Sequence, residues 1–414
     1  MKQLLLLLAF LPFSFPFFAG LNHCSAQSGK WDAINPMPTA SAYLTATVYK
    51  DKIYVFGGLS SPTTTLNTYY SFDLATETWA FEGYLPKYIM GAGAETIGDT
   101  IYLIGGGQSN FVNNYNSVYA FNPANKTWEE RKNMPTARNA LTTSVLNGKI
   151  HVICGIDLTG VHEMFDPATN NWFTLAPYPK GLGSPASCVL DGKIYVIGGT
   201  AGDPWMGEDY VSFYDTLKNS WKPATHMDKP RWGLVAETLN GQIYAIGGVS
   251  APDLSYSDVE VYDPGTGLWT TGTPMQTDRR AFASVVYNGR IYVLGGVSQS
   301  TVQMSVEKYT PVPYVPVQEP GLGGQPIPML HQNVPNPFTQ QSTICYEVAV
   351  AGMVDISIYD LRGQLQKTLV HGRHAPGAYT VDANAAGLQA GVYQYVIRTE
   401  TGQPVSKKMV ILNR

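Results

Sequence analysis

Two glutamates occupy equivalent positions of an internal repeat, and their carboxyls could do acid and base chemistry. Glu95 stands ten residues after Leu85, and Glu237 stands ten residues after Met227. In a ring of six repeats these two lie opposite each other and flank a central channel. Such carboxyl pairs act as acid and base in glycosidases, and they can raise each other's pKa. The alternative is that they bind the backbone of adjacent repeats, although the equivalent positions elsewhere hold Thr47, Ser144, Cys188 and Val285.

Three arginines form a second candidate set, because each stands four residues after a Met of the repeat. They are Arg138, Arg231 and Arg279. We expect them near the axis of the ring, on the face whose loops vary in length, where guanidinium groups suit carboxylates, acidic peptides or sugars. The alternative is that each arginine binds loop carbonyls and carboxylates and holds the sheets together. Further candidates for ligand binding on this face are Tyr115, His162, Trp205, Trp232 and Arg280.

A sequence motif that occurs six times along the chain determines where these side chains lie. In its clearest copy, residues 239–248, Asn240 and Gly241 precede an alternating apolar run that stops at a glycine pair. Asn-Gly between apolar stretches predicts a tight hairpin between antiparallel strands. The repeat period is near 48 residues, and it lacks a helical pattern. It therefore predicts four short strands per repeat, as in a blade of a β-propeller.

The order of the repeat, a glycine pair, then Tyr-Asp, then Trp, as in residues 247–269, is similar to the kelch motif. This resemblance implies an all-β, six-bladed kelch β-propeller over residues 27–310. Cys154 replaces a glycine, and the sixth copy ends without a Trp. Because Trp31 has no strands before it, we expect residues 29–38 to supply the outer strand of the last blade. Closure of this kind protects sheet edges that an open ring leaves exposed.

Both ends of the chain carry features of export. Residues 1–26 have the charged start, the apolar stretch and the small-residue site of a secretory signal peptide, so no transmembrane helix is expected after cleavage. A linker rich in Pro and Gly, residues 311–332, precedes a module over residues 333–414. Alternating short strands in that module predict a small immunoglobulin-like β-sandwich.

The C-terminal module resembles the sorting domain of the type IX (Por) secretion system. The residues that carry the resemblance are 333–338, 354–361, 387–393 and 407–410. The resemblance implies a Bacteroidetes-type bacterium and partnership with the type IX machinery. It also implies a protein that is secreted or held at the outer-membrane surface of a Gram-negative cell.

Composition argues against several kinds of partner. Charged residues make up 14% of the chain, the net charge is −4, and no run of Lys or Arg occurs, so we expect no nucleic acid. Histidines do not occur at metal-binding spacing, so we expect no metal or cofactor. Three cysteines remain after cleavage, namely Cys154, Cys188 and Cys345. Cys154 and Cys188 could pair, or they could be two small buried apolar side chains, which we favour.

Two classes of function remain. The favoured one is a secreted or cell-surface binding module, without catalysis, that holds an extracellular protein or glycan. The alternative is a sugar-active enzyme of the sialic-acid mutarotase-like or galactose-oxidase-like propeller type. A carboxylate and an arginine together in a deep axial pocket would indicate the enzyme. A broad, shallow patch of aromatic side chains would indicate the binding module.

Overall fold

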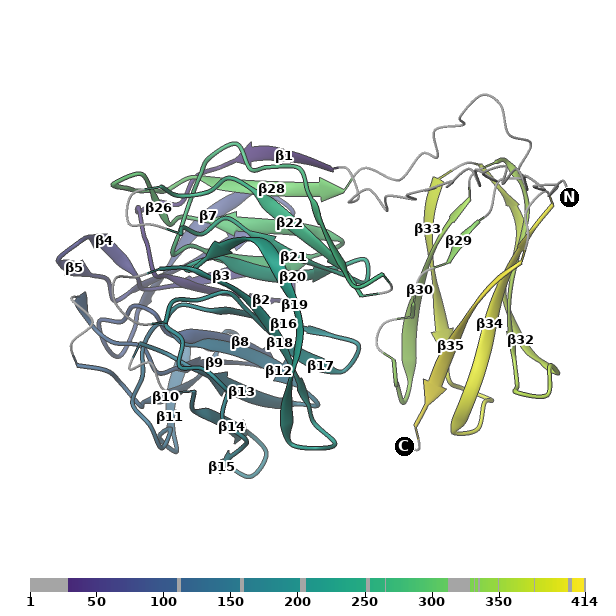
Figure 1. Ribbon diagram of the computed structural model, residues 1–414, viewed down its shortest axis with the longest axis horizontal. Helices are drawn as coiled ribbons and strands as arrows, with labels where there is room; N and C mark the ends of the chain where they lie inside the picture. The colour runs from purple at the N-terminus through teal and green to yellow at the C-terminus, as the bar shows by residue number, and fades with distance from the viewer. Residues whose placement is uncertain are drawn as a thin grey trace, which may run out of the picture.

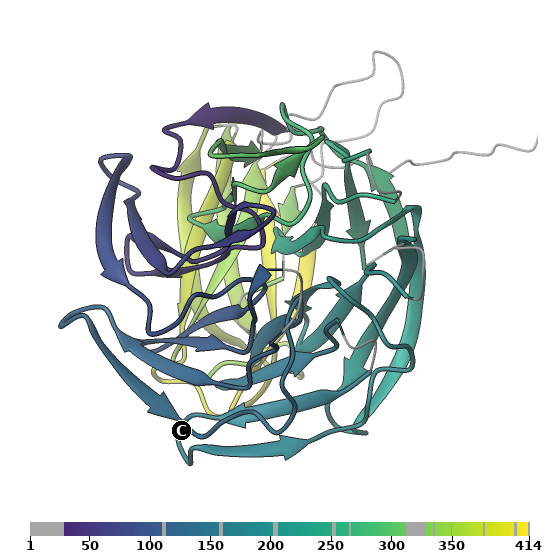
Figure 2. The same ribbon diagram turned by 90° about the vertical axis from the view of Figure 1, so that its left-hand side faces the viewer.

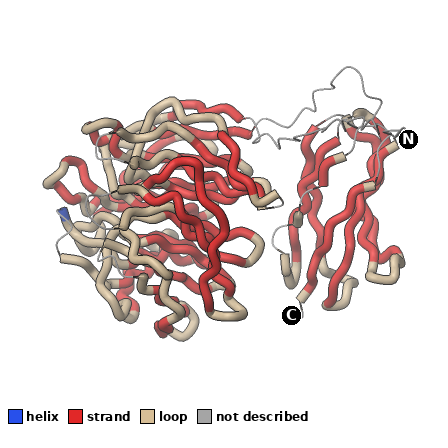
Figure 3. The backbone as a smooth tube through the Cα atoms, in the orientation of Figure 1, coloured by secondary structure: helices blue, strands red, loops and turns tan. Residues whose placement is uncertain are grey.

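The computed structural model describes residues 29–109, 113–156, 160–201, 206–250, 254–264, 266–311, 328–330, 332–333, 336–348, 350–375, 377–400 and 404–412. The predicted signal peptide, residues 1–26, lies outside the described residues, as does most of the predicted linker. The described part of the chain contains no helix that is long and apolar enough to span a membrane. Apart from a short helical turn at Ser109, its regular structure consists of strands (Figure 3).

Up to Pro311, the described residues form six four-stranded antiparallel sheets arranged around a common axis (Figures 1 and 2). The sheets, numbered as blades along the chain, are given from the inner strand outwards. Blade 1 contains β2 (Thr45–Tyr49), β3 (Lys52–Phe56), β6 (Thr68–Asp73) and β7 (Thr78–Tyr84); blade 2 contains β8 (Gly93–Ile97), β9 (Thr100–Ile104), β10 (Val118–Asn122) and β11 (Thr127–Arg131); blade 3 contains β12 (Thr142–Leu146), β13 (Lys149–Ile153), β14 (His162–Asp166) and β15 (Asn171–Thr174). Blade 4 contains β16 (Ala186–Leu190), β17 (Lys193–Ile197), β18 (Glu208–Asp215) and β19 (Ser220–Arg231); blade 5 contains β20 (Val235–Leu239), β21 (Gln242–Ile246), β22 (Val259–Asp263) and β23 (Leu268–Thr271); blade 6 contains β24 (Ala283–Tyr287), β25 (Arg290–Leu294), β28 (Val306–Pro311) and β1 (Gly29–Ile34).

The strand β1 completes blade 6, in agreement with the predicted closure. It pairs antiparallel with β28 (Figure 1). In the register of these strands, Trp31 lies opposite Tyr309. The Trp31 side chain is 3% exposed, and its Nε1 donates to the carbonyl of Thr273 in blade 5 at 2.9 Å. The tryptophans that make the equivalent bond to a preceding blade are Trp79, Trp172 and Trp221. Trp31 therefore occupies the outer-strand position of the repeat.

The turn residues explain where the strands end. Asn240 and Gly241 have φ of 52° and 76°, as a tight hairpin between β20 and β21 requires. The first glycine of a pair adopts a similar conformation, since Gly57 has φ of 56°. A Cβ at Gly57 would lie 2.2 Å from the carbonyl oxygen of Ile89 in the next blade. Glycine at this position therefore allows neighbouring blades to approach closely.

Backbone hydrogen bonds join each blade to its neighbours in two rings. In the first ring, the second glycine of a pair donates to the next blade, as Gly58 does to Ile89 at 2.8 Å. The second ring joins six described residues that all have φ between 47° and 61°. Each donates its N–H to the member in the preceding blade; the members are Tyr43, Gly91, Ala140, Ser184, Gly233 and Ala281. The second ring returns to its starting blade, because Tyr43 donates to Ala281 at 2.7 Å.

Loops between the second and third strands of a blade lie beside the connections between blades. Isolated bridges show this contact, as between Met90 and Gly107 and between Trp232 and Val249. Two of these loops form short hairpins of their own, β4 (Leu59–Ser61) with β5 (Thr64–Thr65) and β26 (Val297–Ser298) with β27 (Thr301–Val302). The loops of variable length and the connections between blades thus lie on the same face of the propeller.

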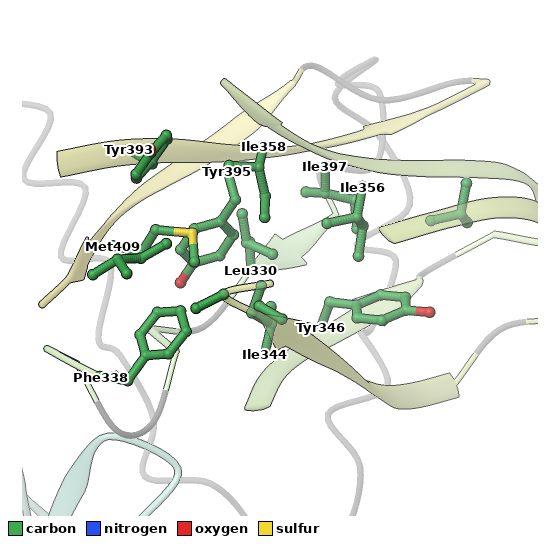
Figure 4. Packing of buried hydrophobic residues seen from close by; sticks show 14 of the residues in the cluster. Leu330, Phe338, Ile344, Tyr346, Ile356, Ile358, Tyr393, Tyr395, Ile397 and Met409 are labelled. Carbon is green, nitrogen blue, oxygen red and sulfur yellow. The ribbon is translucent and has the colours of Figure 1, made fainter. Parts of the chain in front are cut away.

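The C-terminal residues form two sheets packed face to face. One sheet contains β29 (Met329–Leu330), β30 (Gln341–Val348) and β33 (Gly377–Asn384); the other contains β32 (Leu365–His374), β31 (Gly352–Tyr359), β34 (Gly391–Thr399) and β35 (Val405–Ile411). Buried side chains from both sheets meet between them, as Leu330, Ile358, Tyr395 and Met409 do in Figure 4. This arrangement agrees with the predicted β-sandwich.

Candidate functional site

A central channel of about 570 Å³ is lined by the innermost part of every blade. Each blade contributes five consecutive residues: 44–48, 92–96, 141–145, 185–189, 234–238 and 282–286. All of these residues are described. Many of their side chains are serine and threonine hydroxyls, so the channel is polar. A space of this size matches that of small-ligand sites.

Glu95 and Glu237 lie in this channel, on β8 and β20, as the repeat predicted. Glu95 Oε1 accepts a hydrogen bond from Thr143 Oγ1 at 2.7 Å, and Glu237 Oε1 accepts one from Ser284 Oγ at 2.6 Å. Each donor belongs to the following blade, so the partners are hydroxyls of neighbouring blades and not the backbone. Burial raises the pKa of each carboxyl to about 7, and the charge of Glu237 adds to the shift of Glu95.

The lining residues provide no positive charge to balance these carboxylates, because they include no Lys, Arg or His. The third titratable side chain of the lining is Cys188, whose thiol pKa is raised to about 12 by burial. Ser144, at the position equivalent to the glutamates, hydrogen-bonds to Ser187 at 2.8 Å. When both carboxyls are ionised, the channel therefore carries negative charge without a counter-charge from its walls.

The structure contradicts the prediction that Arg138, Arg231 and Arg279 form a shared ligand site. Each of these arginines is 0% exposed, and its guanidinium is bound by groups of a single blade, namely blade 3 for Arg138, blade 5 for Arg231 and blade 6 for Arg279. Arg138 Nη1 donates to the carbonyl of Cys154 at 2.8 Å, and its Nη2 contacts Glu163 Oε2 at 2.8 Å. Arg231 and Arg279 make the same two kinds of contact in blades 5 and 6. Their guanidinium groups thus hold strands and loops together, as the alternative interpretation stated.

The carboxylate partners of the arginines are residues that the sequence analysis missed. They are Glu163, Glu260 and Glu307, each at most 4% exposed. Glu260 also accepts the backbone N–H groups of Asp228 and Lys229 at 2.6 and 3.2 Å, so it ties β22 of blade 5 to the end of β19 of blade 4. A signal was present, because this Glu and the Arg occur together in blades 3, 5 and 6, whereas blades 1, 2 and 4 have neither.

His162 is also a buried structural residue and not part of an exposed ligand face. It is 0% exposed, and its Nε2 lies 2.9 Å from Nδ1 of His151, which occupies a Tyr position of the repeat. The rings of Tyr214 and Trp221 pack against it, with ring centroids 4.7 and 5.4 Å away. Burial lowers the pKa of His151 to about 4 and that of His162 to about 3. Both imidazoles are therefore neutral near pH 7, and one donates to the other.

The remaining predicted ligand-binding residues have different surroundings. Trp232 is 7% exposed, which leaves little of its ring for a ligand. Arg280 is half-buried, and its Nη1 donates to Ser255 Oγ at 2.9 Å. Tyr115 is half-buried, and Lys87 Nζ lies 5.0 Å from the centre of its ring. Trp205 lies outside the described residues.

An exposed group of aromatic side chains on blade 1 was not among the predicted residues. Phe81 and Tyr84, on the outer strand β7, are 52% and 65% exposed. Their ring centroids lie 5.3 Å apart, and the ring of Tyr70 on β6 lies 5.6 Å from that of Phe81. Tyr88, on the connection to blade 2, is 54% exposed. We call Tyr70, Phe81 and Tyr84, whose rings are in contact, the aromatic surface; their exposure depends on the folded arrangement, which the repeat spacing does not reveal.

Within the described residues, no group of three His, Cys, Asp or Glu side chains is placed to hold a metal ion. Cys154 and Cys188 are buried free thiols, so they do not form the disulfide that the sequence left open. The thiol of Cys154 has a pKa raised to about 12 by burial. Both residues therefore act as small buried side chains.

Comparisons with known proteins agree with this geometry. The family model of the KLHDC2/KLHL20/DRC7 Kelch-repeats domain matches residues 18–155 and 91–296. Kelch-like protein 40 of Xenopus tropicalis is 27% identical over 239 residues, which cover 57% of this chain and 31% of that protein. The match thus spans about a third of this relative. The solved structure of YjhT aligns with a TM-score of 0.58 at 18% identity, over 66% of this chain and 96% of that one, and it supports the fold alone.

The closed ring of blades and its repeated glycine pairs define a β-propeller of the kelch type, and the chain belongs to the kelch-repeat family. The family model of the secretion system C-terminal sorting domain matches residues 334–412. The chain therefore combines a kelch propeller with a secretion sorting domain. A domain of this kind implies secretion or a place at the cell surface, and interaction with the type IX machinery.

Proposed function

We propose that the propeller is an extracellular binding module that holds a glycan or protein ligand at its aromatic surface. The observation that carries this proposal is the exposure of the adjacent rings of Phe81 and Tyr84, each more than half exposed. A broad patch of aromatic side chains is the feature that we expected of a binding module. The sorting domain supports the extracellular setting of this function.

The chemistry of the aromatic surface suits recognition. Grouped aromatic rings in contact with water are unfavourable in an isolated protein, and such patches mark interaction sites. A tyrosine presents a flat apolar face together with a hydroxyl, so it can cover the apolar face of a sugar ring or of a peptide side chain and also hydrogen-bond. The contacts between Tyr70, Phe81 and Tyr84 hold these rings in place before a ligand arrives.

The connection from blade 1 to blade 2 carries Lys87, which contacts Tyr115, one of the predicted ligand-binding residues. Lys87 is exposed and precedes Tyr88 in the chain, and its Nζ lies over the ring of Tyr115. The ammonium group and the half-buried Tyr115 ring would offer a polar contact beside the apolar rings. We therefore keep Tyr115 in the proposed binding site and add Lys87 to it.

The experiment compares the purified chain with its Phe81→Ala/Tyr84→Ala variant on glycan arrays and in pull-downs with extracellular proteins. We expect the variant to lose binding by at least about tenfold, since buried aromatic contacts dominate recognition. The control is Phe173→Ala, which removes a single exposed aromatic side chain from the outer strand of blade 3. Unchanged binding by the double variant would exclude the aromatic surface.

The alternative function, a sugar-active enzyme, stays a prediction that rests on Glu95 and Glu237. Their pKa values of about 7 suit groups that exchange protons near neutral pH. The test is turnover of sugars by the purified chain. Loss of that turnover in Glu95→Gln and in Glu237→Gln would favour the enzyme over the binding module.

A further inference from the structure

We propose that the central channel binds an organic ligand that carries a primary ammonium group, and that Glu95 and Glu237 hold it. The chemical class includes amino sugars and peptides with a free amino group. The proposal concerns the channel alone, so it stands or fails independently of the aromatic surface. Three features of the channel carry it: the charge of its walls, the placement of the carboxyls and its size.

The walls of the channel hold two carboxyls and no cationic side chain. Burial of carboxylates without a positive partner is unfavourable, and it raises their pKa as observed here. The fold itself does not require them, because the equivalent positions hold Thr47, Ser144, Cys188 and Val285. A cationic ligand would supply the counter-charge that the protein omits.

The contacts of the two carboxyls leave each of them an oxygen for a ligand. Thr143 and Ser284 donate to Oε1 of Glu95 and of Glu237, and these bonds fix the orientation of each carboxyl. Among the described residues, Oε2 of each carboxyl has no hydrogen-bond partner. The two blades are three apart in the ring of six, so the carboxyls approach a ligand from opposite walls.

The size and ligand set favour an organic cation over a metal ion. A channel of about 570 Å³ has room for a ligand of many atoms, in the range of small-molecule sites. A divalent metal ion prefers six or more oxygen ligands close together. In the described residues, no three His, Cys, Asp or Glu side chains are grouped in that way. A primary ammonium has three donors, which suit two carboxylates and the surrounding hydroxyls.

The test is calorimetric titration of the purified chain with cadaverine, a diamine, and with pentanediol, its uncharged analogue. At about pH 8 the carboxyls are ionised and the amines are charged, so we expect cadaverine to bind and pentanediol not to bind. At about pH 5.5 we expect affinity at least about tenfold lower, because both carboxyls take up protons. Cys188 stays protonated throughout this range, since its thiol pKa is about 12.

Substitutions in the channel test whether the ligand binds at Glu95 and Glu237. The Glu95→Gln/Glu237→Gln variant should lose cadaverine binding, whereas Phe173→Ala, on the outer strand of blade 3 and outside the channel, should keep it. If the double variant does not fold, each single Gln variant should bind at least about tenfold more weakly, by the loss of one charge-assisted bond. Equal binding of pentanediol, or undiminished binding by the Gln variants, would overturn the proposal. Binding of calcium chloride without binding of cadaverine would overturn it as well, in favour of an inorganic cation.

Discussion

Gly296 of blade 6 donates its backbone N–H to the carbonyl of Ser41 in blade 1, at 2.8 Å, where the two ends of the ring meet. The same bond joins every other pair of neighbouring blades, as between Gly58 and Ile89. The junction also has an ion pair of its own, because Lys308 Nζ lies 2.8 Å from Glu77 Oε1. The closing junction is therefore continuous with the rest of the ring, and its stability depends on the strand β1.

We predict that Trp31→Ala lowers the free energy of unfolding by about 3–5 kcal/mol, the usual effect of removing a buried Trp side chain. The change removes the contact with Tyr309, whose ring centroid is 5.1 Å away, and the hydrogen bond to Thr273. Urea denaturation followed by tryptophan fluorescence measures the effect.

The control for this prediction is Leu217→Ala, because Leu217 is 96% exposed. We expect its effect to stay within about 0.5 kcal/mol of the unchanged chain. A urea denaturation curve of Trp31→Ala that overlays that of Leu217→Ala would show that β1 does not close the ring.

We predict that Arg231→Met destabilises the propeller by about 3–5 kcal/mol, because Glu260 is left as a buried charge without its partner. The double variant Arg231→Met/Glu260→Leu should recover more than half of this loss, since no charge then remains buried. A double-mutant cycle by chemical denaturation measures the coupling. Additive effects of the two substitutions would show that the pair is not an energetic unit.

We predict that the His151–His162 pair weakens the fold in acid. Each imidazole has a folded pKa below its ordinary value of 6.5, namely about 4 and about 3, because it is buried. Between pH 6.5 and 4 the unfolded chain therefore binds more protons, so stability falls as the pH is lowered. We expect each imidazole to contribute on the order of 2 kcal/mol to this loss of stability by about pH 5.

The matched variant for the histidine pair is His151→Tyr/His162→Val, which restores the residues most common at these positions in the other blades. Denaturation measured from about pH 7 to 4 should show a flatter profile for this variant than for the unchanged chain. Identical profiles would assign the acid sensitivity to other groups.

We predict the opposite pH dependence for Glu95 and Glu237. Their folded pKa of about 7 lies above the ordinary value of 4.5, so the folded chain binds more protons between these values. Their contribution is present below about pH 4.5 and is lost as the pH rises through 7. The Glu95→Gln/Glu237→Gln variant should therefore be more stable at about pH 8, by roughly 3 kcal/mol for each carboxyl, and unchanged near pH 4.5.

The measurement is best made in the His151→Tyr/His162→Val background, because the histidine pair acts in the opposite direction over the same pH range. A Gln variant that is less stable than its parent at about pH 8 would contradict the raised pKa values and the absence of a counter-charge in the channel.

The repeat spacing predicts the position of a side chain along its blade. It does not predict the contacts of that side chain when its neighbours come from another strand or blade. The position of Arg138 near the blade connection follows from its spacing, but the direction of its guanidinium depends on Glu163, which lies on another strand. In the same way, the sequence predicts His162 as a ligand-binding residue on the face with variable loops, whereas it begins the strand β14 and packs against Trp221. The exposure of Phe81 and Tyr84 does not follow from the repeat spacing, because it depends on which neighbours cover β7.

The sequence by itself determined the blades, their order and the strand that closes them, because the glycine pairs, the Asn-Gly turns and the tryptophans act on the backbone locally and recur at constant spacing. It also determined that Glu95 and Glu237 lie in one channel, since equivalent positions of a ring share the same distance from its axis. Only the tertiary structure decided that the arginines are bound inside the blades, that the carboxyls lack a counter-charge and that the aromatic surface is exposed. Those properties arise from contacts between strands and between blades, and such contacts are set when the ring is complete.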